Sequence, residues 1–331
     1  MSDAPPAGVF IATSTPPEQI GTLASRSEQL GYGEVWVAED YFCYGGLTAA
    51  GLALGATERV KVGLGVLASV ARHPAVTAME IATLARCYPG RLLPGIGHGV
   101  AFWTDQMGLT PKSPLSALTE CVGSIRRLLA GDTVDETGKQ FSFNSVALSH
   151  PAQEDVPILT GVLGPKSLQL SGRIADGTVM SVLSGTKYLQ TALGHIRSGM
   201  AESGRTAHLV PTFALFSVNR DRKAAKQAVR APLAFYLAAV GPHNALTQPY
   251  GYNEILADMT ARGAADLIER EMPDEWVDEL TVSGDPDEVG ERMNALLAAG
   301  ATSVVLSPVN VRTAGEELEL AAREVFPRLN G

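Results

Sequence analysis

Two adjacent carboxylates and one histidine are the side chains of this sequence best suited to acid–base chemistry. Glu39 and Asp40 directly follow the apolar segment 34–38, and His98 stands between two glycines. Neighbouring residues of an extended chain point in opposite directions, so one carboxylate can face a site while the other is tied down elsewhere. Asp40, if burial raised its pKa, could donate a proton. His98 is a second candidate acid. A helix cap or loop carboxylate, and a structural hydrogen bond of the histidine, remain open alternatives.

A second candidate feature is a small-residue loop that leads into a helix. Gly161, Val162, Leu163 and Gly164 follow the apolar segment 156–160, and a proline comes next. Backbone N–H groups at a helix N-terminus bind phosphate well. The sequence therefore predicts a phosphate cradle here, with an ordinary loop as the alternative.

Other kinds of chemistry find less support in the residue pattern. The string Gly63-x-Gly65-x-x-Ala68 imitates a dinucleotide fingerprint, but no helix begins at its third small residue. The histidines lack metal-ligand spacing, so no metal site is predicted. No serine stands in the context of a nucleophile elbow. Metalloenzyme and hydrolase functions are therefore not expected.

Composition narrows the class of protein. The 331 residues include 26 basic and 35 acidic side chains, a net charge of −9, whereas a nucleic-acid binder needs a basic surface. No apolar run approaches the roughly 20 residues of a membrane helix, and the N-terminal residues do not resemble a signal peptide. Three distant cysteines suggest no disulfide framework. We expect a cytoplasmic protein that acts on a small molecule and binds neither nucleic acid nor a membrane.

The elements that must position these residues alternate regularly along the chain. Eight strands are expected, at about 9–13, 34–38, 60–66, 91–96, 156–160, 178–182, 207–218 and 302–306. A helical pattern follows each strand, which predicts a (β/α)₈ TIM barrel formed by one domain over residues 1–331. A doubly wound sheet is the alternative. Barrel active sites lie at the carboxyl ends of the strands, where the candidates above are expected.

Two additions to the barrel are also predicted. Residues 132–150 read as a small β excursion after the fourth helix. Residues 221–280, after the seventh strand, read as a helical insertion divided at Pro232, Gly241-Pro242, Gly251 and Pro273. Phe102 and Trp103 are expected in a loop after the fourth strand.

Several short motifs, taken in this order and at this spacing, resemble a known family. The sequence is similar to the bacterial-luciferase-like flavin and deazaflavin oxidoreductases, and more narrowly to their coenzyme F420-dependent branch, typified by methylenetetrahydromethanopterin reductase. The matching pieces lie within residues 8 to 182: Val35-Trp36-Val37-Ala38-Glu39-Asp40, Gly63-Leu64-Gly65-Val66, Arg72-His73-Pro74-Ala75, Tyr88-Pro89-Gly90-Arg91, Gly95-Ile96-Gly97-His98-Gly99, Gly164-Pro165-Lys166 and Ile174-Ala175-Asp176-Gly177.

The resemblance implies a deazaflavin, coenzyme F420, across the barrel mouth. It would exchange a hydride at C5 with a C=C, C=N or C=O/alcohol group, and a non-proline cis peptide at Gly65-Val66 would lie against its ring. The implied coenzyme contacts are Glu39, Gly65, Val66, His98, Gly99, Gly161, Val162, Leu163 and Gly164.

The resemblance also has departures. Asp40 stands where the resembled enzymes carry a histidine near the reacting carbon. Phe102 and Trp103 are implied to bind substrate. Trp103 and Val100 replace polar and acidic residues of the glucose-6-phosphate dehydrogenase that belongs to the same F420-dependent branch. Glucose 6-phosphate is therefore not expected, and a flatter or more apolar substrate is. An FMN-dependent monooxygenase and a non-catalytic flavin-binding barrel are the alternatives, and a homodimer would be common in the family.

Overall fold

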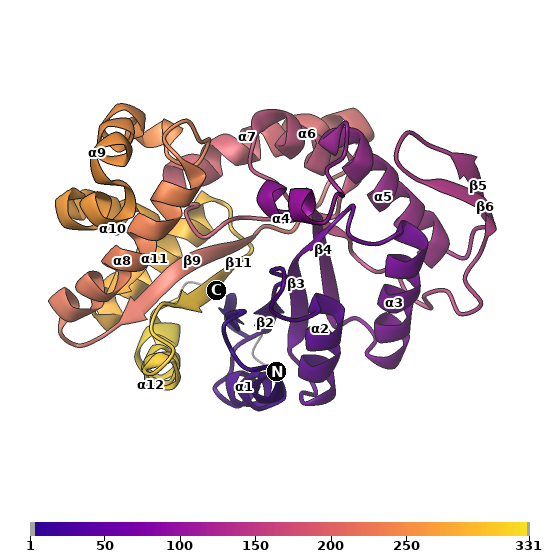
Figure 1. Cartoon of the computed structure of the whole chain (residues 1–331). Coiled ribbons are helices and arrows are strands. Elements are labelled where there is room, and N and C mark those ends of the chain that lie inside the picture. Colours follow the sequence, from indigo (N-terminus) through magenta and orange to yellow (C-terminus); the bar gives the residue numbers. More distant parts are fainter. Residues whose placement is uncertain (1–3, 330–331) are drawn as a thin grey trace.

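In the computed structural model, which describes residues 4–329, nine parallel strands form one curled sheet (Figure 1). The strands follow the order β10-β9-β11-β1-β2-β3-β4-β7-β8. Isolated bridges from Gly177 to Leu209 and from Met180 to Thr212 join β8 to the chain at β9. The predicted (β/α)₈ fold is confirmed. The strands are β1 Ala7–Phe10, β2 Glu34–Val37, β3 Lys61–Ala68, β4 Leu92–Gly97, β7 Leu159–Gly161, β8 Gly177–Val179, β9 Pro211–Val218, β10 Thr281–Gly284 and β11 Ser303–Pro308.

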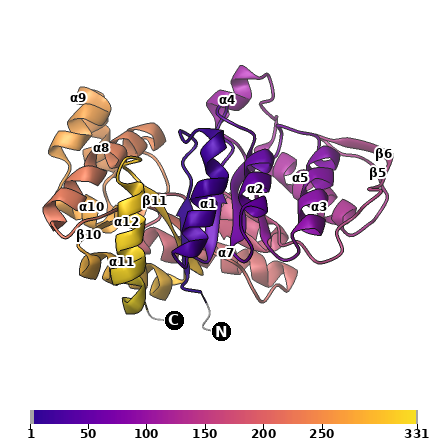
Figure 2. The same cartoon turned by 90° about the horizontal axis from the view of Figure 1, so that it is seen from below.

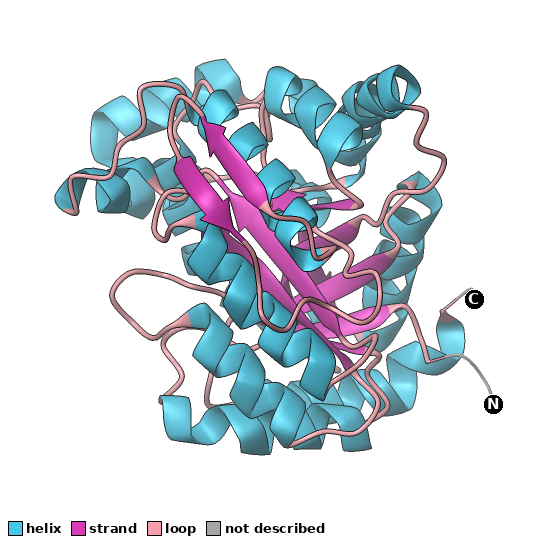
Figure 3. Ribbon diagram, turned by 90° about the vertical axis from the view of Figure 1, so that its right-hand side faces the viewer, coloured by secondary structure: helices cyan, strands magenta, loops and turns pink. Residues whose placement is uncertain are grey.

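Helices cover the outer face of this sheet, as Figure 3 shows. Their bounds are α1 Ile20–Gln29, α2 Gly46–Gly55, α3 Pro74–Cys87, α4 Ala101–Gln106, α5 Pro114–Leu129, α6 Pro165–Ile174, α7 Thr186–Ser203, α8 Arg222–Val240, α9 Asn253–Glu271, α10 Asp274–Leu280, α11 Pro286–Ala299 and α12 Ala314–Leu320. No helix in the described part of the chain is both long and apolar enough to span a membrane.

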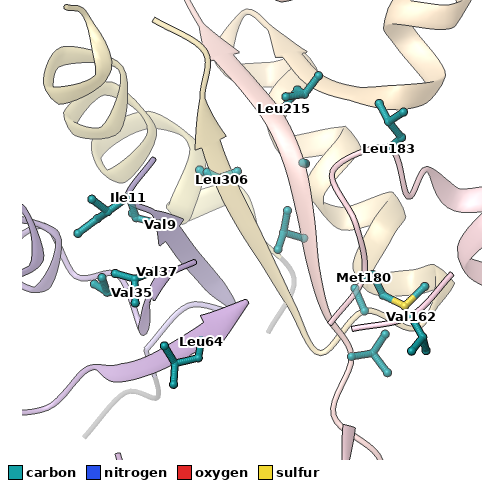
Figure 4. Packing of buried hydrophobic residues seen from close by; sticks show 14 of the residues in the cluster. Val9, Ile11, Val35, Val37, Leu64, Val162, Met180, Leu183, Leu215 and Leu306 are labelled. Atoms are coloured by element: carbon teal, nitrogen blue, oxygen red, sulfur yellow. The ribbon is translucent and has the colours of Figure 1, made fainter. Parts of the chain in front are cut away.

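The core has an outer and an inner layer because alternate residues of a strand face opposite sides of the sheet. Val35 and Val37 of β2 belong to the large cluster between the strands and the helices (Figure 4). Trp36, between them, points into the barrel, where its ring meets that of Phe213 at a centroid distance of 5.4 Å. Gly63 makes room for this indole, since an added Cβ would lie 2.2 Å from it.

Both additions to the barrel are present. The excursion is an antiparallel pair, β5 Val134–Thr137 and β6 Ser142–Val146, and the insertion comprises α8, α9 and α10. The expected division at Pro232 is wrong, because this proline lies inside α8. The carbonyl that it leaves without an N–H partner is that of Ala228, an exposed residue, so water can satisfy it.

Two short elements differ from the sequence-based expectation. Phe102 and Trp103 lie on the short helix α4, not in a loop. The strand β10, which pairs with β9, was not predicted. Six residues are too few to show a helical period in α4. In β10, the hydroxyls of Thr281 and Ser283 share a hydrogen bond of 2.8 Å, so this polar stretch is buried without penalty.

Candidate active site

A cavity of about 690 Å³ opens at the carboxyl ends of the barrel strands. Its walls come from segments that follow the strands, namely 12–14, 38–41, 98–100 and 161–164, together with Tyr236 of α8. Pockets of about 300–1,000 Å³ suit one ligand of drug size. The cavity therefore lies where the active sites of such barrels are found, and its volume is sufficient for a ligand.

The predicted site residues converge on this cavity with one exception. Phe102 lies on the exposed side of α4, with 66% of its surface accessible, and does not line the cavity. The predicted residues that do line it are Glu39, Asp40, Gly65, Val66, His98, Gly99, Trp103, Gly161, Val162, Leu163 and Gly164.

Glu39 is held by fixed partners. Arg72 donates to both of its carboxylate oxygens, at 2.6 and 2.5 Å, and the Gly46 N–H donates at 2.8 Å. The Glu39 side chain is only 2% exposed, and its hydrogen bond raises the pKa of Arg72. Such a saturated carboxylate anchors the loop. Contact between Glu39 and a coenzyme stays a prediction.

Asp40 points the other way, as the alternation of an extended chain requires. It is half-buried on the cavity wall, and its Oδ2 accepts a hydrogen bond of 2.7 Å from the Thr13 hydroxyl. Burial and then the Asp40 charge raise the pKa of Tyr44 to about 12, and also raise that of Tyr236. Asp40 therefore has no cation beside it among the described residues that line the cavity, and it lies close to two phenols.

Sequence reasoning missed Tyr41, which follows the two carboxylates. Its ring lies 6.0 Å from that of Trp103, and its hydroxyl is shielded from solvent without a hydrogen-bond partner. Burial and then the charge of Glu39 raise its pKa to about 12, so the phenol keeps its proton at neutral pH. An unpaired donor on a cavity wall is available to a ligand. Only its position beside Asp40 could have indicated this in the sequence.

His98 also lines the cavity, at the end of β4, and contacts α6. Its Nε2 lies 3.1 Å from the Ser167 hydroxyl, a partner that the sequence did not reveal. Burial lowers the pKa of His98, partly opposed by the backbone of Pro114. A neutral imidazole at physiological pH is better suited to hydrogen bonding than to acting as a general acid. The geometry therefore favours His98 as a hydrogen-bonding group.

Val66 fills the barrel below the cavity. The peptide bond between Gly65 and Val66 is cis, as the family resemblance implied. Glycines surround the Val66 side chain: a Cβ added at Gly97 or at Gly161 would lie 2.7 Å from one of its methyl groups. These glycines relieve crowding, and they let Val66 form a smooth apolar floor.

The loop before α6 has the features of a phosphate site. Gly164 is the N-cap of this ten-residue helix, no side chain caps it, and a Cβ added at Gly164 would meet nothing within 4 Å. Uncapped N–H groups beside open space are available to an anion. Together with the apolar floor at Val66, this loop fits a phosphate-bearing ring coenzyme.

A sequence profile of the luciferase-like monooxygenases matches residues 4–303. The chain belongs to this family. Among its relatives, the 5,10-methylenetetrahydromethanopterin reductase of Archaeoglobus fulgidus is 31% identical over 92% of this chain and 93% of its own. The F420-dependent glucose-6-phosphate dehydrogenase of Nakamurella multipartita is 30% identical over 95% and 93%.

Solved structures agree with this assignment. The coenzyme F420-dependent tetrahydromethanopterin reductase from Methanopyrus kandleri superimposes with a TM-score of 0.84 at 26% identity, covering 98% of this chain and 99% of the other. This chain is thus a luciferase-like oxidoreductase by family, and relatives are named for F420.

The side chains that line the cavity are mostly uncharged, and several of them are aromatic. No lysine or arginine occurs among the described residues that line it. Its large side chains are aromatic instead: Phe10, Tyr41, Trp103, Phe213 and Tyr236. The described residues of these walls thus include no lysine or arginine to neutralise an anion.

Proposed function

We propose that this protein is a coenzyme F420-dependent oxidoreductase. It transfers a hydride between the deazaflavin C5 and a C=C, C=N or C=O/alcohol group of a small organic substrate. The observation that carries the proposal is one cavity that combines an open, uncapped helix N-terminus at Gly164, an apolar floor at Val66 and an acid without a cationic partner in the described lining, Asp40. Identity of 30–31% to relatives named for this coenzyme or for a reductase supports the choice of cofactor.

The protein's own part in the reaction is to bind the coenzyme, to orient the reactants and to donate or accept a proton. The backbone of residues 161–164 holds the coenzyme phosphate, and Val66 supports the ring. When bound, the coenzyme supplies or accepts the hydride. Arg72 and Gly46 fix Glu39, which keeps Asp40 toward the cavity. Asp40 holds the proton that the substrate gains or loses at the atom next to the hydride-accepting carbon.

The same walls select against anionic substrates. A sugar phosphate would need a cationic partner in the substrate half of the cavity, and the described lining has none. Val100 and Trp103 stand there, both apolar in contact surface. We therefore propose uncharged enones, imines, ketones or alcohols as substrates.

A substrate screen tests this function. Purified protein and reduced F420 are mixed with enones, imines and ketones, and with glucose 6-phosphate as the anionic control, while the deazaflavin absorbance is followed. Oxidation of reduced F420 by an uncharged acceptor, absent in Asp40→Asn, supports the proposal. Turnover restricted to the sugar phosphate would refute the substrate class. Coenzyme binding without turnover of any acceptor, in either direction, would favour a non-catalytic barrel.

A further inference from the structure

Five exposed apolar side chains line the cavity or are next in sequence to a residue that lines it, and we call them the apolar rim. Val100 and Leu163 line the cavity while remaining 50% and 36% exposed. Phe42, Phe102 and Phe235 are 70%, 66% and 62% exposed. A single exposed apolar residue is ordinary, but several around one cavity mark a binding surface.

The rim continues the cavity wall outward. The exposed ring of Phe42 lies 5.9 Å from that of Tyr41, and the exposed ring of Phe235 lies 5.6 Å from that of Tyr236. In each pair the inner tyrosine lines the cavity. Phe102 likewise precedes the lining residue Trp103. The apolar part of a ligand that extends out of the cavity can therefore contact the exposed phenylalanines next to the aromatic lining.

Different elements supply these side chains. Phe42 follows β2, Leu163 follows β7, Phe102 belongs to α4 and Phe235 to α8. The helix α4 stands out from the body of the molecule (Figure 2). Exposed apolar groups that adjoin one cavity from four separate segments are not explained by the amphipathic pattern of any single helix.

The size and charge of the cavity indicate what covers the rim. About 690 Å³ is the volume of a site for one ligand of drug size, so a coenzyme and a substrate that both enter the cavity share this space. A substrate with a long apolar body then extends past the mouth. The described lining contains no cationic side chain that would attract an anion.

We infer that the substrate is an uncharged lipophilic molecule longer than the cavity. Its reactive carbonyl, imine or alkene end lies beside Asp40, and its apolar body lies on the apolar rim. This inference rests on the proposed function for the reaction. The rim itself is tested by binding alone.

The test compares rim variants with matched exposed positions elsewhere. Phe42→Ser, Phe102→Ser and Phe235→Ser remove rim side chains. Met79→Ser on α3 and Ile255→Ser on α9 are the controls, because these residues are 52% and 49% exposed and do not line the cavity. Retained far-UV circular dichroism shows that each variant is folded.

Binding of two kinds of probe to the apolar rim can be measured without turnover. The uncharged dye Nile red is titrated into the coenzyme-free protein, and straight-chain 2-enones of five to ten carbons displace it. We expect affinity to rise about two- to fourfold for each added methylene, and this chain-length gain to shrink in the rim variants but not in the controls. Equal behaviour of rim and control variants, or affinity independent of chain length, would overturn the inference.

F420 titration of the same proteins separates the two proposals. Rim variants should bind F420 as tightly as the unaltered protein. A protein that binds no F420 but shows chain-length-dependent enone binding at the rim would contradict the proposed function and leave the rim assignment standing. Binding of F420, with enone affinity that is the same in rim and control variants, would agree with the proposed function and contradict the rim assignment.

Discussion

Arg72 holds both carboxylate oxygens of Glu39, and this contact determines which way the next residue, Asp40, faces. The donor–acceptor distances are 2.6 and 2.5 Å, and the Glu39 side chain is 2% exposed. With Glu39 tied to Arg72 and Gly46, alternation turns the Asp40 side chain the other way, where Thr13 holds it. The sequence predicted that one of the two adjacent acids is tied down, and Glu39 has the fixed partners; the role of Asp40 in the reaction stays a prediction.

Removal of Arg72 should destabilise the fold. Arg72→Ala leaves the buried Glu39 carboxylate without its charge partner, so the free energy of unfolding should fall by about 3 kcal/mol. Urea unfolding followed by circular dichroism measures it. Arg59→Ala is the control, since Arg59 pairs with Glu58 at 73% and 86% exposure and should change stability by less than about 0.5 kcal/mol. Equal losses in the two variants would contradict the structural role.

Asp40 should matter for turnover and not for coenzyme binding. Asp40→Asn keeps the shape and can still accept from Thr13, but it cannot release or take up a proton. We expect kcat to fall about 10²- to 10⁴-fold with the Kd for F420 within a factor of two to three of the original. His98→Ala should lower activity less, because neutral His98 serves as a hydrogen-bonding group. Unchanged turnover in both variants would rule out the proton-donor hypothesis.

Tyr41 offers a test in which stability and binding move in opposite directions. Tyr41→Phe deletes a hydroxyl that is buried without a partner and keeps the ring against Trp103. The coenzyme-free protein should become more stable, by up to about 1 kcal/mol, while ligand affinity should weaken by about three- to tenfold. Thermal unfolding and fluorescence titration provide the two readouts. A loss of stability without a change in affinity would show that the hydroxyl has a structural partner.

His208 should make stability depend on pH. Burial, and then the charge of Arg205, lowers its pKa from 6.5 to about 4, and Thr178 lies 2.8 Å from its Nε2. Between those pH values the unfolded chain binds a proton that the folded chain does not, so stability present above pH 6.5 is lost as the pH falls toward 4.

The variant His208→Asn isolates this contribution. Its unfolding free energy should decline less over the same range, by on the order of 2 kcal/mol. The exposed His150→Asn is the control, and it should follow the unaltered protein. Identical pH profiles for all three proteins would show that His208 is not the group responsible.

The sequence predicted which candidate residues meet at the cavity wherever strand ends alone decide position. Polar and glycine residues after strands meet at one face of a barrel, so Asp40, His98 and the loop 161–164 could be placed together without coordinates. Tyr236 could not, because it reaches the cavity from α8 inside an insertion whose path depends on tertiary packing. The contact of His98 with Ser167 likewise joins residues 69 positions apart.

Short elements and single contacts escaped prediction for a related reason. The helix α4 and the strand β10 are too short to carry a period, and β10 is stabilised by a buried pair of hydroxyls that no pattern announces. The role of Gly97 and Gly161 in making room for Val66 became visible only when the three residues met in space.

The most direct test of the account is a fluorescence titration of the purified protein with oxidised F420, reduced F420 and FMN in parallel. We predict tight binding of F420 and little binding of FMN, and a substitution that fills the open space beside the α6 N-terminus, Gly164→Asp, should weaken F420 binding by at least about tenfold through repulsion of its phosphate. A preference for FMN would contradict the proposed cofactor and favour a flavin-dependent monooxygenase. Binding of neither would show that residues 161–164 are not a phosphate cradle.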